Sequence, residues 1–504
     1  MLETIYRTPF WMPRRPWADW QAERGARLHR FINEQLYPYS PLYRRLFDDH
    51  RIDPRSIRSV TDLRRIPFTT KKDVAPTAEH PTRHIDLVLQ PDMEKLRKYA
   101  PKSTLLKLLM LRALHGDATA KEEVRREYGP VHVIFTTGRT ALPTQFVYSP
   151  VDWTRLHMIG KRIGEVGGID PDARSLNVFP FAPHLAFWQT FAVGQGVPTL
   201  VVHTGGGKVM GTAGNILAMA RMQPEVIIGV PGFVYHMLRQ AALEGVKLTK
   251  LYKIALGGER VPLGLRARLG EICAEMGAPN VRVQSVLGFT EARQCWAECT
   301  PPDHETSYGF HTYPDLEIFE CVDPETGEPV GPGERGELVY TTLEGRGSCV
   351  IRYKSGDIAD GGIVYDPCPG CGRIVPRIST TLSRRSDIGE FQLTKIRGTL
   401  VDLNNFLPCM ASIAEVIEWQ VVVRKKDGDS HGLDEIVLSV ALADGVNVED
   451  AKRKIVSKLM TEVEVAPNVI EVLPLERLTE NLGLDTQMKE LRIRDLRSEA
   501  KAST

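Results

Sequence analysis

The sequence predicts an α/β protein with a large N-terminal domain of mixed or parallel sheets and helices, followed by a small α+β C-terminal domain. Three observations predict this fold class. The chain has 504 residues, more than a single hydrophobic core usually holds. Residues 224–288 alternate short apolar runs with helical patterns. Beyond residue 385, two strand patterns, a helix and a further strand form a separate group.

The composition is that of a globular protein, with 42% hydrophobic and 25% charged residues. The 64 Lys and Arg nearly balance the 63 Asp and Glu, so the net charge of +1 gives no general reason to expect nucleic acid or anionic lipid as a partner. The N-terminus lacks an apolar signal region, and no stretch reaches the roughly 18 apolar residues of a membrane span. We expect a cytoplasmic protein whose 8 cysteines are mostly reduced.

The first elements are helical. Residues 18–75 alternate amphipathic runs with Asp-Pro and Ile-Pro stops, which predicts a helical preface. Residues 76–130 carry two further helical patterns without recognisable chemistry. This second segment is either an insertion or a surface for a partner.

The central elements predict a parallel sheet. The runs "VHVIFTTG" and "VPTLVVHTGGG" are short and β-branched, and "PEVIIGV" has the pattern of a buried strand. Pro231 suits the start of a helix in which Val234, Met237 and Leu238 recur at helical spacing. The strand "YKIALGGE", a helix after Pro262 and the strand "VRVQSVLG" follow. Ligands of such sheets bind at the carboxyl ends of strands, where "GGE" and "GFTE" both stand.

The remaining elements are strands and turns. Past residue 310 the turns are typical of hairpins, most clearly in "DPETGEPVGPGERGELVYTTL". After residue 385, "EWQVVVRKKDGDSHGLDEIVLSVALADG", the helix "NVEDAKRKIVSKLMTEV" and the strand "NVIEVLPL" predict the small α+β domain.

Two local patterns suggest a binding site without reference to any family, one for phosphate and one for metal. Each is only part of a known motif. The loop "TTGRTALPT" (136–144) follows a strand, and its hydroxyls and amides can hold a polyphosphate, although a plain Thr-rich turn fits equally well. No complete P-loop or dinucleotide-binding fingerprint is present. "CPGC" spaces Cys368 and Cys371 as a zinc knuckle does, but one pair is half of a tetrahedral site.

Seven short motifs occur along the chain in a fixed order. Each motif alone is weak evidence for a family, but their order makes a resemblance specific. "TTGRTALPT", "GGERVP", "GFTE", "GERGELVYTTL", "IRYKSGDIA", "RRSD" and "KIRG" resemble the successive motifs of the adenylate-forming ligase superfamily. The preface ending in "IPFTTKKDV" and the "AEC" after "GFTE" resemble its phenylacetate-CoA ligase branch. The resemblance covers about residues 28–75 and 130–495.

The resemblance implies an AMP-forming acid-thiol ligase that uses ATP and Mg²⁺ to make an acyl-adenylate and then coenzyme A to make a thioester. It implies an adenylation domain at 1–385 and a small mobile domain at 387–504, with the hinge at 386–387. Glu291 would hold Mg²⁺, Thr290 the α-phosphate, Asp357 the ribose and Lys489 the adenylation transition state. The other implied nucleotide contacts are Thr136, Thr137, Gly138, Thr140, Gly258, Glu259, Gly288, Phe289, Arg385 and Arg397. Each of these assignments has a purely structural alternative. Arg385 could be a solvated surface charge, Asp357 could stabilise a Ser-Gly-Asp turn, and Lys489 could be an exposed lysine of a basic helix.

The resemblance also implies an acyl pocket and a metal site. "FAPHLAFWQTF" stands where the family lines its substrate, which suits a flat aromatic acid, although core packing explains each ring as well. The implied substrate-binding residues are His184, Phe187, Trp188, Phe233 and Tyr235. Cys299 and His311 would complete a structural zinc site with the "CPGC" pair; reduced thiols are the alternative.

The sequence departs from the family pattern at four places. Ala141 and Leu142 stand where the phosphate loop has a second Gly and a Lys, and Leu287 replaces a Tyr before "GFTE". No Gly precedes Lys489, and the segment between Asp387 and Arg397 is four residues longer than in the family pattern. Three functions therefore compete: a CoA ligase, an adenylate-forming enzyme with another acceptor or an AMP transferase, and a non-catalytic binding protein. Homodimers are common in the family, but no interface signature stands out in the sequence.

Overall fold

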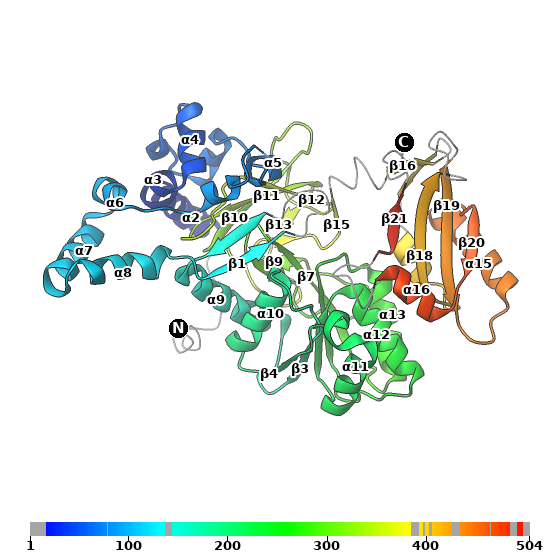
Figure 1. Cartoon of the computed structure of the whole chain (residues 1–504). Coiled ribbons are helices and arrows are strands. Elements are labelled where there is room, and N and C mark those ends of the chain that lie inside the picture. The colour runs from blue at the N-terminus through cyan, green and yellow to red at the C-terminus, as the bar shows by residue number, and fades with distance from the viewer. Residues whose placement is uncertain are drawn as a thin grey trace.

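The computed structural model describes residues 17–77, 79–136, 144–384, 393–396, 399–402, 406–425, 434–463, 465–483 and 491–496 (Figure 1). Among these residues, no helix is both long enough and apolar enough to cross a membrane.

The N-terminal preface is helical, as predicted. Its helices are α2 (Trp17–Phe31), α3 (Tyr37–Tyr39), α4 (Pro41–Asp49) and α5 (Lys71–Val74), with a π-helical turn at Ile32–Leu36 and 3-10 turns at Pro54–Ser56 and Val60–Arg65. Thr70 and Asp73 form a capping box that starts α5. One residue earlier, the Thr69 amide donates to the carbonyl of Arg352 at 3.0 Å. This bond attaches the preface to the strand with the "YKSGD" motif.

The segment at 76–130 contains three α-helices rather than the two predicted. They are α6 (Met93–Tyr99), α7 (Lys102–His115) and α8 (Asp117–Tyr128), after a 3-10 turn at Arg83–Leu87. Pro101 separates α6 from α7, and Gly116, at a φ of 85°, separates α7 from α8. In Figure 1 the three helices lie beside the preface and extend away from the sheets.

The predicted parallel sheet is confirmed and has six strands. Its spatial order is β4 (Leu200–His203), β3 (Arg174–Asn177), β5 (Val226–Gly229), β6 (Lys253–Gly257), β7 (Arg282–Phe289) and β8 (Gln294–Ala297). The first five strands are parallel, and β8 runs antiparallel to β7. The "GGE" and "GFTE" motifs therefore meet at one edge, because the carboxyl ends of β6 and β7 coincide.

Helices cover both faces of this sheet. They are α9 (Pro150–Gly167), α10 (Leu185–Gly196), α11 (Gly207–Met222), α12 (Pro231–Leu243) and α13 (Leu263–Glu275). Successive residues of β5 point to opposite faces: Ile227 packs in a core cluster with α11, α12 and α13, and Ile228 packs near Phe187 of α10. Pro231 occupies the first turn of α12, as predicted.

The rest of the large domain is antiparallel. One sheet has the order β10 (Glu317–Val322), β11 (Gly336–Thr342), β12 (Tyr353–Ala359) and β15 (Leu382–Arg384). A second has β13 (Ile363–Val364), β14 (Arg377–Ile378) and β9 (Phe310–His311), and β1 (His132–Phe135) pairs with β2 (Gln145–Tyr148). The predicted hairpin is the β10–β11 pair.

The C-terminal elements form their own core, as predicted. A sheet of order β20 (Val469–Val472), β19 (Asp434–Leu442), β18 (Val416–Lys425) and β21 (Ile493–Asp495) packs with α14 (Phe406–Ala411), α15 (Val448–Glu462) and α16 (Leu475–Leu482). The strands β16 (Leu393–Ile396) and β17 (Thr399–Asp402) form a separate pair. The predicted boundary at 386–387 lies outside the described residues and stays a prediction.

Candidate active site

The "GFTE" turn joins β7 to β8 in a tight hairpin. A Cβ atom at Gly288 would lie 2.4 Å from Cys295 Sγ and 3.5 Å from Leu185 Cδ2, so only glycine fits there without a shift. Thr290 and Glu291 are half-buried at the turn, whereas Phe289 points into the core. The hairpin thus presents a hydroxyl and a carboxylate at the carboxyl edge of the parallel sheet.

Glu291 accepts a hydrogen bond from a tyrosine of another sheet. The Tyr353 hydroxyl donates to Glu291 Oε1 at 2.9 Å, and the Tyr353 side chain is 2% exposed at the start of β12. The bond therefore joins the parallel sheet to the antiparallel one at the site. Sequence reasoning placed Glu291 here but missed Tyr353, which lies in the same motif as Asp357.

A bulge in β12 sets the position of Asp357. The pairing of β11 with β12 shifts register within this strand, and Gly356 has a φ of 77°, which favours glycine. Ser355 Oγ accepts the Asp357 amide at 3.0 Å and donates to the Leu338 carbonyl at 3.1 Å. Asp357 is buried and lies opposite Arg384 of β15. The position of the Asp357 side chain is thus set by the backbone of a bulge rather than by a regular strand.

Gly258 and Glu259 directly follow β6. Gly258 has a φ of 85°, and a Cβ atom there would meet nothing within 4 Å. The space beside it is open, as a ligand approaching the backbone requires. Because Gly257 is the register partner of Val286, this turn and the "GFTE" turn leave the sheet side by side.

The base of the predicted phosphate loop is closed by its two end residues. The Thr136 amide donates to the Thr144 carbonyl at 3.0 Å, and the Thr144 amide donates to Thr136 Oγ1 at 3.1 Å. The next strand, β2, contacts the loop that follows the "GFTE" motif, because Arg293 Nη1 donates to the Val147 carbonyl at 3.0 Å. Thr137, Gly138 and Thr140, with Ala141 and Leu142, lie outside the described residues. The same is true of Arg385, Arg397 and Lys489.

An aromatic cluster lies beside this loop. His184 contacts the Phe135 carbonyl through Nδ1 at 3.2 Å, and one turn later Trp188 places its ring 4.4 Å from that of His132 and 5.2 Å from that of Phe187. His132 Nε2 and Trp188 Nε1 are buried without a hydrogen-bond partner among the described residues. Burial lowers the pKa of His132, which favours the neutral ring.

The other two predicted substrate residues lie elsewhere. Phe233 belongs to the core cluster on the α12 side of the sheet, and the Tyr235 hydroxyl accepts a hydrogen bond from Arg239 at 3.1 Å. The structure thus groups Phe187 and Trp188 but does not bring Phe233 and Tyr235 to them. His132 and Trp153, which complete the cluster, were missed because neither belongs to a recognised motif.

The four predicted metal ligands converge. The ligand atoms of Cys299, His311, Cys368 and Cys371 all lie within 4.8 Å of one another. Cys299 Sγ is 3.6 Å from Cys368 Sγ, and Cys371 Sγ is 3.2 Å from His311 Nε2. Hydrogen bonding to Cys299 and Cys368 lowers the pKa of the Cys371 thiol. His304 is not part of the cluster and packs against Gly270.

This fold and this edge define a class of protein. Hydroxyl, carboxylate and open backbone groups gather where α/β sheets bind nucleotides, so the chain is a nucleotide-binding α/β protein. More narrowly, the chain belongs to the AMP-binding enzyme family, which matches residues 64–344.

Individual relatives extend the likeness over most of the chain. It is 25% identical to the phenylacetate-coenzyme A ligase of Thermus thermophilus over 477 residues, 94% of this chain and 92% of that one. It is 24% identical to the phenylacetate-coenzyme A ligase of Escherichia coli over 390 residues, 73% of this chain and 72% of that one. The fold resembles 2-hydroxyisobutyryl-CoA ligase in the postadenylation state, with a TM-score of 0.73, 21% identity and coverage of 99% and 94%.

Proposed function

We propose that this protein activates a carboxylic acid with ATP as an acyl-adenylate and transfers the acyl group to coenzyme A. The observation that carries the proposal is the Glu291–Tyr353 contact at 2.9 Å, which joins the "GFTE" and "YKSGD" motifs at one edge. The likeness to phenylacetate-coenzyme A ligases over nearly the whole chain supports the choice of acceptor.

The described residues suit this chemistry. The Glu291 carboxylate would hold Mg²⁺ against the phosphates, as a hard cation prefers, and Thr290 would contact the α-phosphate. Asp357 would accept both ribose hydroxyls, and the open backbone at Gly258 and Glu259 would border adenine. Lys489, outside the described residues, would stabilise charge that develops on the phosphate.

We further propose that the acid is aromatic. His132, Trp153, Phe187 and Trp188 make an edge-to-face cluster next to the base of the phosphate loop. Two buried ring nitrogens in this cluster lack partners among the described residues, so a substituent that accepts a hydrogen bond could satisfy the Trp188 N–H. A phenyl or arylacetyl group with such a substituent matches the cluster better than a saturated chain.

The test is ATP–pyrophosphate exchange with Mg²⁺, without thiol, across aromatic, arylacetic and fatty acids. We expect exchange that aromatic acids stimulate, followed by AMP release only when coenzyme A is added. Glu291→Gln and Lys489→Ala should each reduce exchange by roughly 100-fold, as loss of a major electrostatic contact does. Glu275→Gln, an exposed acid on α13, is the control. No exchange with any acid of the panel, while ATP still binds, would favour a non-catalytic protein. AMP release that requires an amine or a carrier-protein thiol instead of coenzyme A would show that the acyl group goes to another acceptor.

We propose that Cys299, His311, Cys368 and Cys371 hold a structural zinc ion. Three thiols and one imidazole, largely buried, make the donor set of closed tetrahedral sites, which leave no open position for catalysis. His311 Nδ1 has no hydrogen-bond partner among the described residues, so Nε2, which faces Cys371, is the nitrogen suited to the metal. Metal analysis should find about one zinc per chain, and Cys371→Ser should lose it while Cys273→Ala keeps it. Less than about 0.3 equivalents would refute the site.

A further inference from the structure

A lysine is buried at the amino edge of the parallel sheet, opposite the edge that carries the "GGE" and "GFTE" motifs. Lys253, the first residue of β6, is 2% exposed. Its Nζ donates to the carbonyls of Gly167 and Gly168 at the C-terminal end of α9 and, at 2.9 Å, to Thr300 Oγ1. The centroid of the Tyr252 ring lies 5.6 Å from Nζ. All four partners are uncharged, and no carboxylate of the described residues forms an ion pair with the lysine.

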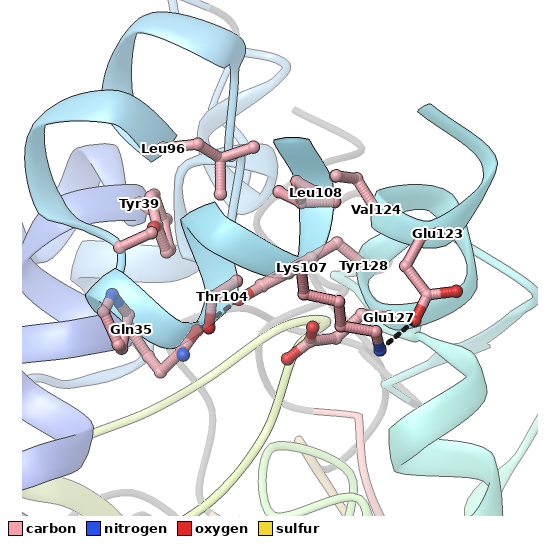
Figure 2. A pocket seen from close by; sticks show the side chains of 12 residues that line it. Gln35, Tyr39, Leu96, Thr104, Lys107, Leu108, Glu123, Val124, Glu127 and Tyr128 are labelled. Carbon is pink, nitrogen blue, oxygen red and sulfur yellow. Dashed lines mark hydrogen bonds and ion pairs between the residues drawn. The ribbon is translucent and has the colours of Figure 1, made fainter. Parts of the chain in front are cut away.

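Cations with acid partners show how unusual this arrangement is. Arg266, 0% exposed, pairs with Glu298 at 2.7 Å. Even the exposed Lys107 pairs with Glu123, shown dashed in Figure 2, beside a small cavity of about 110 Å³. A buried charge is costly unless an opposite charge compensates it. Lys253 therefore requires a negative charge that the carboxylates do not supply.

Two series of contacts lead from Lys253 to the proposed metal ligands. Thr300, which accepts from Lys253, directly follows Cys299 in the chain. The last turn of α9, which also accepts from Lys253, accepts at 3.3 Å from Nη2 of Arg373. The carbonyl of Arg373 in turn accepts the Cys368 amide at 3.0 Å. The lysine thus lies beside the cluster of ligands rather than at a distant edge of the domain.

The zinc site has a negative charge of its own once it is loaded. Cysteine binds zinc as the thiolate, so three cysteines, a neutral His311 and Zn²⁺ have a net charge of about −1. Burial lowers the pKa of Lys253 to about 8, and the charge of the Cys299 thiolate acts in the opposite direction. The ammonium group is therefore present at neutral pH, where it faces a site of opposite charge.

We propose that Lys253 supplies the counter-charge of the loaded zinc site and thereby strengthens zinc binding without touching the metal. This inference rests on the proposed zinc site and goes beyond it, because it assigns a residue that belongs to no motif. The competing explanation is that Lys253 only caps α9, since the carbonyls at the C-terminus of a helix favour a cation.

A second cation near the site provides a comparison. Arg377 lies opposite His311 in the pairing of β14 with β9. Its guanidinium donates to the carbonyls of Tyr308 and Asp366. We assign the counter-charge to Lys253, because the charge of Cys299 acts directly on the lysine. Arg377→Gln should therefore change zinc affinity less than a neutral residue at position 253 does.

The test is the zinc affinity of the full chain, measured at about pH 7 by competition with a chelator. Lys253→Gln keeps N–H donors but removes the charge, and Lys253→Met removes both. Each should weaken zinc binding by roughly 10-fold, as loss of a group that supports metal ligands does. Lys247→Met is the matched control, because Lys247 donates to the Glu275 carbonyl at the end of α13, at 2.9 Å. An unchanged thiolate-to-metal charge-transfer band of the cobalt-loaded variants verifies that the ligands are intact.

Thermal unfolding with and without zinc separates the counter-charge from the helix cap. Zinc raises the unfolding midpoint of the wild type by binding the folded state. If Lys253 compensates the charge of the site, this increase is smaller in Lys253→Gln. If Lys253 only caps α9, the midpoints with and without zinc fall equally, which would overturn the proposal.

The remaining outcomes are equally decisive. Wild-type zinc affinity in Lys253→Gln would overturn the proposal and leave the zinc site in place, whether or not Lys253→Met binds more weakly. A loss of affinity in Arg377→Gln alone would assign the counter-charge to the arginine instead. Less than about 0.3 equivalents of zinc in the wild type would refute the site itself, and this inference with it.

Discussion

At the scale of single residues, the site depends on a hydrogen bond between two motifs far apart in sequence. The Tyr353 hydroxyl donates to Oε1 of Glu291, one of the two carboxylate oxygens that would bind Mg²⁺ under the proposed function. A neutral donor fixes the direction of a carboxylate without removing its charge. Residues that orient a metal ligand affect metal affinity strongly even though they do not touch the metal.

We therefore predict that Tyr353→Phe raises the Mg²⁺ concentration needed for half-maximal pyrophosphate exchange by roughly 10-fold, because hydrogen bonds to charged groups contribute about 1.5–3 kcal/mol. The rate at saturating Mg²⁺ should fall much less. Titration of exchange activity with Mg²⁺ at fixed ATP measures both quantities.

The control for this prediction is Tyr313→Phe. The Tyr313 hydroxyl is also buried and donates to the Cys295 carbonyl at 3.1 Å, without touching Glu291. It should lower stability by a similar amount and leave the Mg²⁺ dependence unchanged. Equal Mg²⁺ shifts in the two variants would mean that Tyr353 acts through stability alone.

At the scale of elements, the start of α9 holds the turn that carries Glu291. Ser149 and Asp152 form the capping box of α9, and the Asp152 carboxylate also accepts the amides of Arg346 and Gly347. Its Oδ2 lies 3.0 Å from Nη1 of Arg293, which follows the "GFTE" turn at a φ of 60°. One buried carboxylate thus joins a helix start, a loop and the β7–β8 hairpin.

We predict that Asp152→Asn destabilises the large domain by about 3 kcal/mol at pH 7, because it leaves Arg293 buried without a counter-charge. Burial alone would raise the pKa of Asp152, but Arg293 outweighs it and holds that pKa below its ordinary value. The pair therefore contributes fully above the unfolded pKa of about 3.9 and is lost as the pH falls through the folded value. Urea unfolding at pH 7 and at about pH 3.5 should show the difference between variant and wild type shrinking in acid.

Asp53→Asn is the matched control, since Asp53 pairs with Arg55 on the exposed surface. It should leave stability at pH 7 unchanged. If Asp152→Asn were equally mild, the Arg293 contact would have no part in holding the turn.

The elements also show what a sequence can predict here. The parallel strands at Val226–Gly229 and Lys253–Gly257 carry buried apolar runs with Pro and Gly at their ends, so local pattern determines them. Residue chemistry together with the family likeness predicted the metal ligands Cys299, His311, Cys368 and Cys371. Their convergence in the structure is confirmed. Tyr353, Asp152 and Arg293 were missed because their roles arise from contacts between distant segments, which no local period encodes. Phe233 was grouped with Trp188 by analogy, and the two residues pack in different core clusters.

At the scale of the whole molecule, a small polar contact joins the two domains. Arg239 Nη1 of α12 donates to the Val416 carbonyl at 2.9 Å, and His236 Nδ1 lies 3.6 Å from Glu418 Oε2 on β18. Glu418 is 1% exposed and also binds Arg492 within its own domain. Burial alone would raise the pKa of Glu418, but Arg492 and His236 lower it to about 2, so the carboxylate stays ionised at neutral pH.

We predict that His236→Ala weakens this contact without unfolding the small domain, because Arg492 remains to pair with Glu418. Amide hydrogen exchange at the start of β18 should become roughly 5-fold faster, the change expected for losing about 1 kcal/mol. Exchange within α15, on the far side of the small-domain core, should not change. Gln240→Ala is the control on the same helix, because Gln240 donates to Glu244, the residue just after α12, rather than to the small domain. Equal exchange in the two variants would mean that His236 does not hold the domains together, and faster exchange in α15 would mean that the small domain itself has been destabilised.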